Sequence, residues 1–234
     1  TNILKSDYNF NLNNSQLSSK YNYLNININN FCSFIGNNYD SDNNPLVNTV
    51  LQLIINRNIP LKDTYLYNFY QKFQPKNYGK VFNLKDTNKL SKLPQTSYFY
   101  PWLHNKPTNI FRAGLFGPKD ITNVEHRVTR LKNLIELIKE KNYIPTEEDI
   151  IDGYILVNNL DYRFLIISGH HRVAVLYGLN KKNIVNNNKI IVKFNSKKVK
   201  VKIIHRNDSY KWTGVLSKYI SEQDSLELFD SFFI

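Results

Sequence analysis

Five consecutive residues, Ser168-Gly169-His170-His171-Arg172, combine the side chains and the flexible backbone that suit a phosphate-binding turn. The apolar run just before them predicts a buried strand, and the apolar residues just after them predict a helix. The first amides of a helix have no partner within it and favour an anion. Arg172 can hold two phosphate oxygens, and His170 and His171 can act as acid or base. The motif therefore predicts a phosphate site at a strand-turn-helix corner.

Two other interpretations of this motif stay open. His170 and His171 can be ordinary turn residues, with Arg172 in a surface salt bridge. They can also bind a metal ion, although neighbouring histidines rarely chelate one ion from a turn and no carboxylate adjoins them. We expect the phosphate site because a strand precedes the motif and a helix follows it.

Phosphoryl transfer also requires a base or a metal-binding acid. Glu125, near the start of the helix expected over 122–142, is the first candidate, and Asp120 is the second. Either carboxylate can hold Mg²⁺ together with nucleotide phosphates. A carboxylate in the first turn can also serve only to balance the charge of the helix end.

Other residues can add charge or a stacking surface to this site. Arg112, in a loop rich in glycine and proline, can reach the phosphates or remain a surface arginine. On the long helix, either Arg127 or Arg130 can face the same place. The aromatic segment that contains Trp102 is expected to anchor in the core, and stacking on a base or sugar is the alternative.

Apolar periodicity predicts the surrounding elements. We expect helices over 45–55, from an Asp63 cap to Phe73, around Leu84 to Leu93, over 122–142, over 171–179 and within 215–233. The stripe Leu66, Phe69, Tyr70 and Phe73 favours core over a ligand platform. Strands are expected around 21–28, over 154–157 and 162–167 as a hairpin or as near neighbours, and over 190–194 and 199–204.

The charge of the chain favours acidic partners. The formal net charge is +12, and between residues 181 and 218 eleven lysines and arginines stand against one acid, Asp208. This segment can be a solvated basic face, or it can attract nucleic acid or another anion towards the site. One cysteine, Cys32, excludes an internal disulfide and favours a cytoplasmic location, and no apolar run predicts a transmembrane segment.

The chain resembles the ParB and sulfiredoxin superfamily of nucleotide-binding domains over about residues 110–205. Residues 131–139, followed by Asn142-Tyr143-Ile144-Pro145, look like the first conserved box of that superfamily, and 168–179 looks like the second. His-His-Arg is also similar to the ParB-fold free serine kinases. Asn44-Pro45-Leu46-Val47, Gln74-Pro75-Lys76 and Pro101-Trp102 resemble uncharacterised ParB-like proteins encoded among surface-polysaccharide genes.

The resemblance implies a bound nucleotide such as ATP, ADP or CTP, with Mg²⁺. Activities in the superfamily include CTP hydrolysis, ATP-dependent phosphoryl transfer, serine phosphorylation and nuclease action. Ser168 stands where the kinase-type members have an acid, and His170 replaces the sulfiredoxin cysteine. The DNA-binding helices of ParB have no counterpart here.

We therefore expect an α/β (α+β) fold, a ParB/sulfiredoxin-like domain with a small mixed sheet and flanking helices. Residues 1–109 would form an N-terminal extension, 110–205 the nucleotide-binding domain and 206–234 a helical tail packed on it. The expected function is a nucleotide-dependent phosphotransferase or nucleotide hydrolase, kinase-like, acting on a small hydroxylated molecule or a glycan. A non-enzymatic switch module that binds nucleotide or nucleic acid is the second possibility, and a nuclease is the third.

Overall fold

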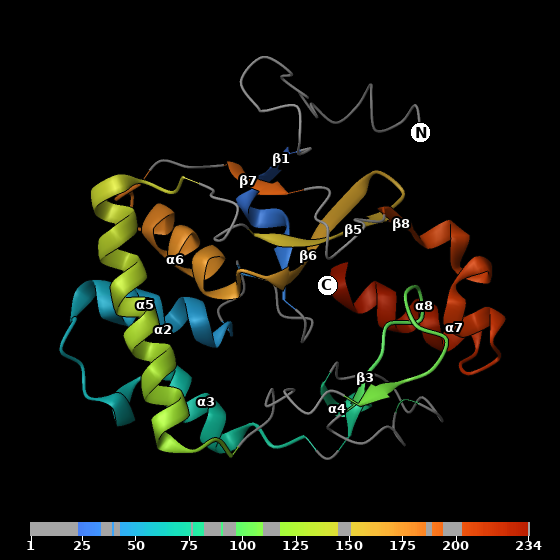
Figure 1. The fold of residues 1–234 in the computed structure, drawn as a ribbon, viewed down its shortest axis with the longest axis horizontal. Helices are drawn as coiled ribbons and strands as arrows, with labels where there is room; N and C mark the ends of the chain where they lie inside the picture. Colours follow the sequence, from blue (N-terminus) through green and yellow to red (C-terminus); the bar gives the residue numbers. More distant parts are fainter. Residues whose placement is uncertain are drawn as a thin grey trace.

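A mixed β-sheet with helices on both of its faces organises the chain (Figure 1). The computed structural model describes residues 23–33, 39, 43–75, 77–81, 90, 97–109, 118–144, 151–185, 189–193 and 203–233. Within these residues the sheet has six strands, in the order β1-β7-β5-β6-β2 with β8 also paired to β5. The expected mixed α+β fold is confirmed.

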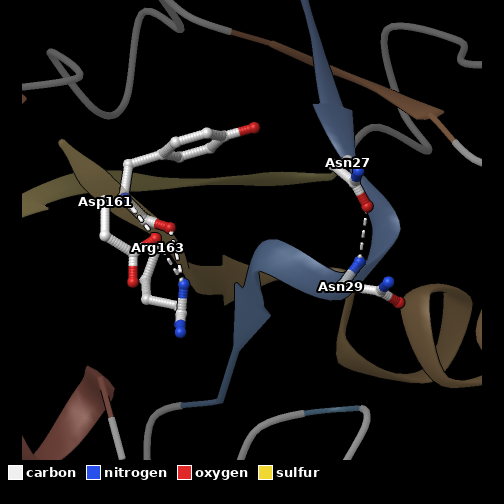
Figure 2. Close-up of polar contacts among 5 residues, drawn as sticks. Asn27, Asn29, Asp161 and Arg163 are labelled. Carbon is white, nitrogen blue, oxygen red and sulfur yellow. Dashed lines mark hydrogen bonds and ion pairs between the residues drawn. The ribbon is translucent and has the colours of Figure 1, made fainter.

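The centre of the sheet is the hairpin of β5 (Asp152–Asn158) and β6 (Asp161–Ser168). The turn between them is short, and Asn159 adopts a left-handed backbone with φ 52°, which asparagine tolerates well. Asp161 accepts a 2.9 Å hydrogen bond from the guanidinium of Arg163 at the start of β6 (Figure 2). The predicted hairpin is confirmed.

The outer strands come from distant parts of the chain. β1 (Tyr23–Asn27) runs antiparallel to β7 (Lys189–Lys193), and β2 (Phe31–Cys32) runs parallel to β6. β8 (Ile203–His205) lies parallel to β5. Between β1 and β2 the short helix η1 (Ile28–Asn30) turns the chain, where the Asn27 side chain accepts from the Asn29 amide (Figure 2).

Alternate residues of the central strands face opposite sides of the sheet, as the pleat requires. On one side, Phe164 and Ile166 pack against α2 (Pro45–Ile55), α3 (Tyr65–Lys72), α5 (Ile121–Lys141) and α6 (His170–Lys181). We call this side the helical face, and Figure 1 shows these helices together beside the sheet. The asparagine cap expected for the first helix is present, since the Asn44 side chain accepts from the amides of Leu46 and Val47.

The other side, which we call the aromatic face, packs Leu165 and Leu156 against C-terminal elements. These are η4 (Arg206–Lys211), α7 (Thr213–Leu216), α8 (Glu222–Asp230) and η5 (Ser231–Phe233). The small ladder of β3 (Ser97–Tyr98) and β4 (Thr108–Asn109) flanks the segment that carries Trp102. A further single helical turn, α4 (Tyr78–Val81), precedes it. Five interlocked rings form the aromatic cluster of this face: Tyr100, Trp102, Trp212, Phe229 and Phe232.

Most predicted elements lie within a few residues of their expected places, and the differences have simple causes. The cap of the second helix is Thr64 rather than Asp63, because Asp63 belongs to the preceding 3-10 turn η2 (Leu61–Asp63). The long helix begins one residue earlier than expected, after the Asp120 cap. The strand predicted over 199–204 is described only at its end, and most of the helix predicted from Leu84 to Leu93 lies outside the described residues.

The expected extension and the expected nucleotide-binding domain share one hydrophobic core. Val50 and Leu53 of α2 lie in the same buried cluster as Leu131 of α5 and Val173 of α6. Side chains on the two sides of the boundary at residue 109 therefore pack together. The division of the chain into three segments stays a prediction. Among the described residues, no helix is long and apolar enough to cross a membrane.

Candidate functional site

The predicted phosphate motif lies at a sharp corner between β6 and α6. Gly169 is the N-cap of α6 and has a left-handed backbone with φ 102°. A Cβ atom there would lie 2.9 Å from the Ile151 side chain, so the corner requires glycine for both conformation and space. No side chain caps this end of the helix, and Ser168 before it is exposed. The strand, turn and helix predicted for this motif are all present.

His170 points inward and is tied to a residue far away in the sequence. Its Nδ1 atom lies 3.0 Å from the hydroxyl of Tyr39, which is fully buried. Burial, and then the charge of Arg127, lower the pKa of His170 to about 4. A neutral imidazole with so low a pKa is a weak base at neutral pH. The position of His170 suits it to holding the corner in place.

His171 is also held neutral. Burial lowers its pKa to about 3, and the nearby charges of Arg127 and Arg130 act in the same direction. Its Nε2 atom is buried and has no hydrogen-bond partner among the described residues. The catalytic role predicted for the two histidines would therefore require a ligand that changes this environment.

Arg172 is the member of the motif that reaches a pocket. Its side chain is 6% exposed and lines a pocket of about 360 Å³ between α5 and α6, which we call the α5–α6 pocket. The other lining residues come from one face of α5: His126, Thr129, Arg130, Asn133, Leu134 and Leu137. Ser168, Gly169, His170 and His171 are not among the lining residues, so the pocket lies beside the corner.

The α5–α6 pocket is strongly cationic. Arg130 makes neither a hydrogen bond nor an ion pair with the described residues, and none of the described lining residues is acidic. Burial, together with the charge of Arg130, lowers the pKa of Arg172, while Tyr143 acts in the opposite direction. Two guanidinium groups around one pocket repel each other, and a bound anion would remove this repulsion.

The other arginine of α5 has a different role. Arg127 donates a 2.9 Å hydrogen bond to Asn123 and lies 5.5 Å from the ring centre of Tyr70. Of the two alternatives in the sequence, Arg130 therefore faces the pocket. The lining residues His126, Thr129 and Asn133 were not predicted. His126 and Asn133 lie four residues before and three residues after Arg130, a helical spacing that indicates a shared face, whereas adjacent Thr129 gives no such signal.

The predicted carboxylates lie outside the pocket lining. Asp120 caps α5, with its carboxylate accepting a 2.8 Å hydrogen bond from the Thr122 amide. Glu125 is exposed on the same helix, one residue before His126 of the pocket wall. No group of three or more metal-ligating side chains occurs among the described residues. The described lining thus does not fit a protein-held Mg²⁺ ion.

The remaining predicted residues are elsewhere. Trp102 is 3% exposed on the aromatic face and stacks on Tyr100, so it anchors the core and its stacking on a nucleotide base is not supported. Arg112 lies outside the described residues. Burial raises the pKa of the Cys32 thiol, which disfavours a reactive thiolate. Of the basic segment 181–218, residues 186–188 and 194–202 lie outside the described residues.

Comparison with known proteins gave no relative: no family model, no curated protein and no solved structure matches this chain.

Proposed function

We propose that the protein binds a phosphate-bearing nucleotide in the α5–α6 pocket, with Arg130 and Arg172 as the phosphate ligands. The observation that supports this most is the pairing of these two guanidinium groups around a pocket without a described acid. Guanidinium groups bind phosphate oxygens in pairs and keep their charge at any ordinary pH. The resemblance of the glycine corner to the ParB and sulfiredoxin superfamily supports the same ligand class.

The rest of the lining suits a nucleotide better than free phosphate. Thr129, Asn133 and His126 can donate or accept hydrogen bonds to phosphate and sugar oxygens. Leu134 and Leu137 offer an apolar wall for the base, and Leu137 is 44% exposed. A volume of about 360 Å³ lies within the usual range of ligand pockets.

Phosphoryl transfer to a small hydroxylated molecule or a glycan is the catalytic extension of this proposal. It needs a base next to the phosphates. Glu125 adjoins His126 of the pocket wall and is exposed, whereas Glu136, which adjoins Leu137, pairs with Arg57 and Lys139. Mg²⁺ would have to be held mainly through the nucleotide phosphates. A cytoplasmic location also belongs to the proposal, since nucleotides are abundant there and the chain has one cysteine.

A thermal-shift screen with ATP, ADP, CTP and GTP, with and without Mg²⁺, tests the binding. A nucleotide at one hundred times its Kd stabilises the folded state by about 2.7 kcal/mol, which is a shift of about 5–10 °C for a chain of this size. Arg172→Ala and Arg130→Ala should each abolish the shift. Arg57→Ala is the matched control, because Arg57 lies outside the pocket in an exposed ion pair with Glu136.

Three further outcomes decide between the functions. Phosphate release that depends on nucleotide and is lost in Glu125→Gln would support phosphoryl transfer or hydrolysis. A shift without turnover would support the switch module. Tight, salt-sensitive DNA binding with no nucleotide shift would overturn the proposal in favour of nucleic-acid binding.

A further inference from the structure

A second pocket lies on the helical face, between the first turn of α2 and the exposed side of α3. Its volume is about 420 Å³, and it shares no lining residue with the α5–α6 pocket. We call it the α2–α3 pocket. Its described lining residues are Asn43, Pro45, Asn48, Tyr65, Asn68, Phe69, Lys72 and Phe73.

The spacing of residues on α3 explains how this pocket forms. The helix buries Leu66 and Tyr70 in the core of the helical face. The pocket residues follow one another at intervals of three, one, three and one, which places them on a second stripe of the helix. This second stripe is Tyr65, Asn68, Phe69, Lys72 and Phe73.

One wall of the pocket is aromatic. The rings of Phe69 and Phe73 are stacked, with centres 4.7 Å apart and planes inclined by 19°, and both side chains are only partly buried. Tyr65, at the start of the same stripe, is 53% exposed. Aromatic faces carry partial negative charge and attract the weakly positive axial C–H groups on one face of a saturated ring.

The polar part of the pocket lining is formed by three asparagines, Asn43, Asn48 and Asn68. Asn68 uses its amide nitrogen for bonds of 3.1 Å to the carbonyls of Lys62 and Thr64. The side chain is thereby fixed, and its carbonyl oxygen is the atom it can offer to a ligand. Amide side chains provide both donors and acceptors, as a ligand with several hydroxyl groups requires.

The pocket also carries positive charge. Lys72 is exposed and makes no ion pair with the described residues, and none of the described lining residues is acidic. The ligand that complements this pocket has a flat apolar ring face, several hydroxyl groups and a negative charge. An aromatic acid without hydroxyl groups would satisfy the rings and the lysine, but it would offer no donor to the carbonyl oxygen of Asn68.

The geometry points to the α2–α3 pocket as a binding site for an acidic saccharide of the uronic acid class. The sugar ring lies against Tyr65 and Phe69, its carboxylate pairs with Lys72, and its hydroxyls bond with the asparagines. This inference does not depend on nucleotide binding, because the two pockets have no lining residue in common.

Isothermal titration calorimetry on the full chain tests this site with digalacturonate, its neutral methyl ester and phenylacetate as probes. We expect saturable binding of digalacturonate that is about tenfold weaker, or about 1.4 kcal/mol, in Tyr65→Ala. Lys72→Gln should weaken digalacturonate by a similar factor and leave the methyl ester unchanged. Phenylacetate should bind more weakly than digalacturonate.

Two controls separate loss of the site from loss of the fold. Tyr210→Ala removes a tyrosine that is 54% exposed on another part of the surface, and Lys106→Gln removes an exposed lysine outside the pocket. Both should bind digalacturonate like the wild type. The inference is overturned by no saturable binding of either saccharide, by tighter binding of phenylacetate, or by wild-type affinity in both pocket variants.

Discussion

Aromatic side chains have opposite roles on the two faces of the sheet. On the aromatic face, Trp102 is 3% exposed and packs edge-on against Trp212 at 5.4 Å. Phe69 packs against the core of the helical face and Phe73 against the buried cluster of the aromatic face. These two rings stack with centres 4.7 Å apart but remain partly exposed at the wall of a pocket. Ring stacking alone therefore does not tell a core from a binding surface. The difference lies in what covers the outer side of the rings.

The two faces also differ in charge. Both pockets of the helical face carry unpaired cations among their described lining residues, Arg130 in one and Lys72 in the other. On the aromatic face the cations of η4 are paired, Arg206 with Asp230 and Lys211 with Asp208. We infer that the aromatic face contributes mainly to stability and that the helical face carries the binding sites.

The largest expected effect is on the aromatic face. Trp102→Ala should lower the free energy of unfolding by about 3–5 kcal/mol, because it opens a cavity within the aromatic cluster. Urea denaturation measures this change. Trp102→Phe should cost less than about 1.5 kcal/mol, since it keeps most of the ring and removes a buried indole N–H without a described partner. A small loss for Trp102→Ala would contradict the structural role of this face.

On the helical face, the stability of the protein should depend on the close contact between α6 and α2. A Cβ atom at Gly178 of α6 would lie 2.5 Å from a methyl group of Val50 on α2. Such overpacking costs about 1–3 kcal/mol, and the better helix propensity of alanine returns about 1 kcal/mol. We expect Gly178→Ala to destabilise by about 1 kcal/mol. In a double-mutant cycle read by urea denaturation, Val50→Ala should cost less in the Gly178→Ala background than in the wild type, and additive effects would contradict the contact.

The neutral histidines predict a pH dependence that originates on the helical face. His170 and His171 have folded-state pKa values of about 4 and about 3, below the ordinary 6.5. Between the folded-state pKa of each histidine and pH 6.5, the unfolded chain binds more protons than the folded chain. The contribution of the two histidines to the free energy of unfolding is therefore fully present above about pH 6.5 and is lost as the pH falls. Each histidine contributes a slope of up to about 1.4 kcal/mol per pH unit.

His171→Gln tests this slope directly. The variant should lose less stability than the wild type between pH 6.5 and about 4, as measured by urea denaturation at fixed ionic strength. Carboxylates titrate in the same range in both proteins, so the difference between the two curves isolates the histidine. Parallel curves would show that His171 is not held neutral by the fold.

The smallest effect on stability is expected at Tyr65 of the α2–α3 pocket. Tyr65 is 53% exposed and lies outside the two buried clusters. Tyr65→Ala should change the free energy of unfolding by no more than about 0.5 kcal/mol, as is usual for surface positions. Thermal unfolding with Trp102→Ala measured in parallel gives the contrast. A loss similar to that of Trp102→Ala would place Tyr65 in the core.

The sequence predicted the helices and strands better than the exposure and tertiary contacts of individual side chains. Local periodicity and capping chemistry defined the hairpin, the long helix and the corner at Gly169, because these depend on neighbouring residues. The aromatic segment also predicted the burial of Trp102. Phe69 was expected in the core with the rest of its stripe, and its partial exposure depends on distant segments that leave one side of the ring open. The same reason explains why Arg172 was identified while most of the opposite wall on α5 was not.

The pairing of the outer strands has a consequence for how the chain reaches its folded state. Tyr23 of β1 lies opposite Lys193 of β7, and Phe31 of β2 lies opposite Phe164 of β6. Contacts between residues so far apart close large loops and slow folding. During synthesis the first two strands must wait, exposed and unpaired, until most of the polypeptide has left the ribosome. This delay makes β1 and β2 the strands of the nascent chain most open to mispairing with another copy.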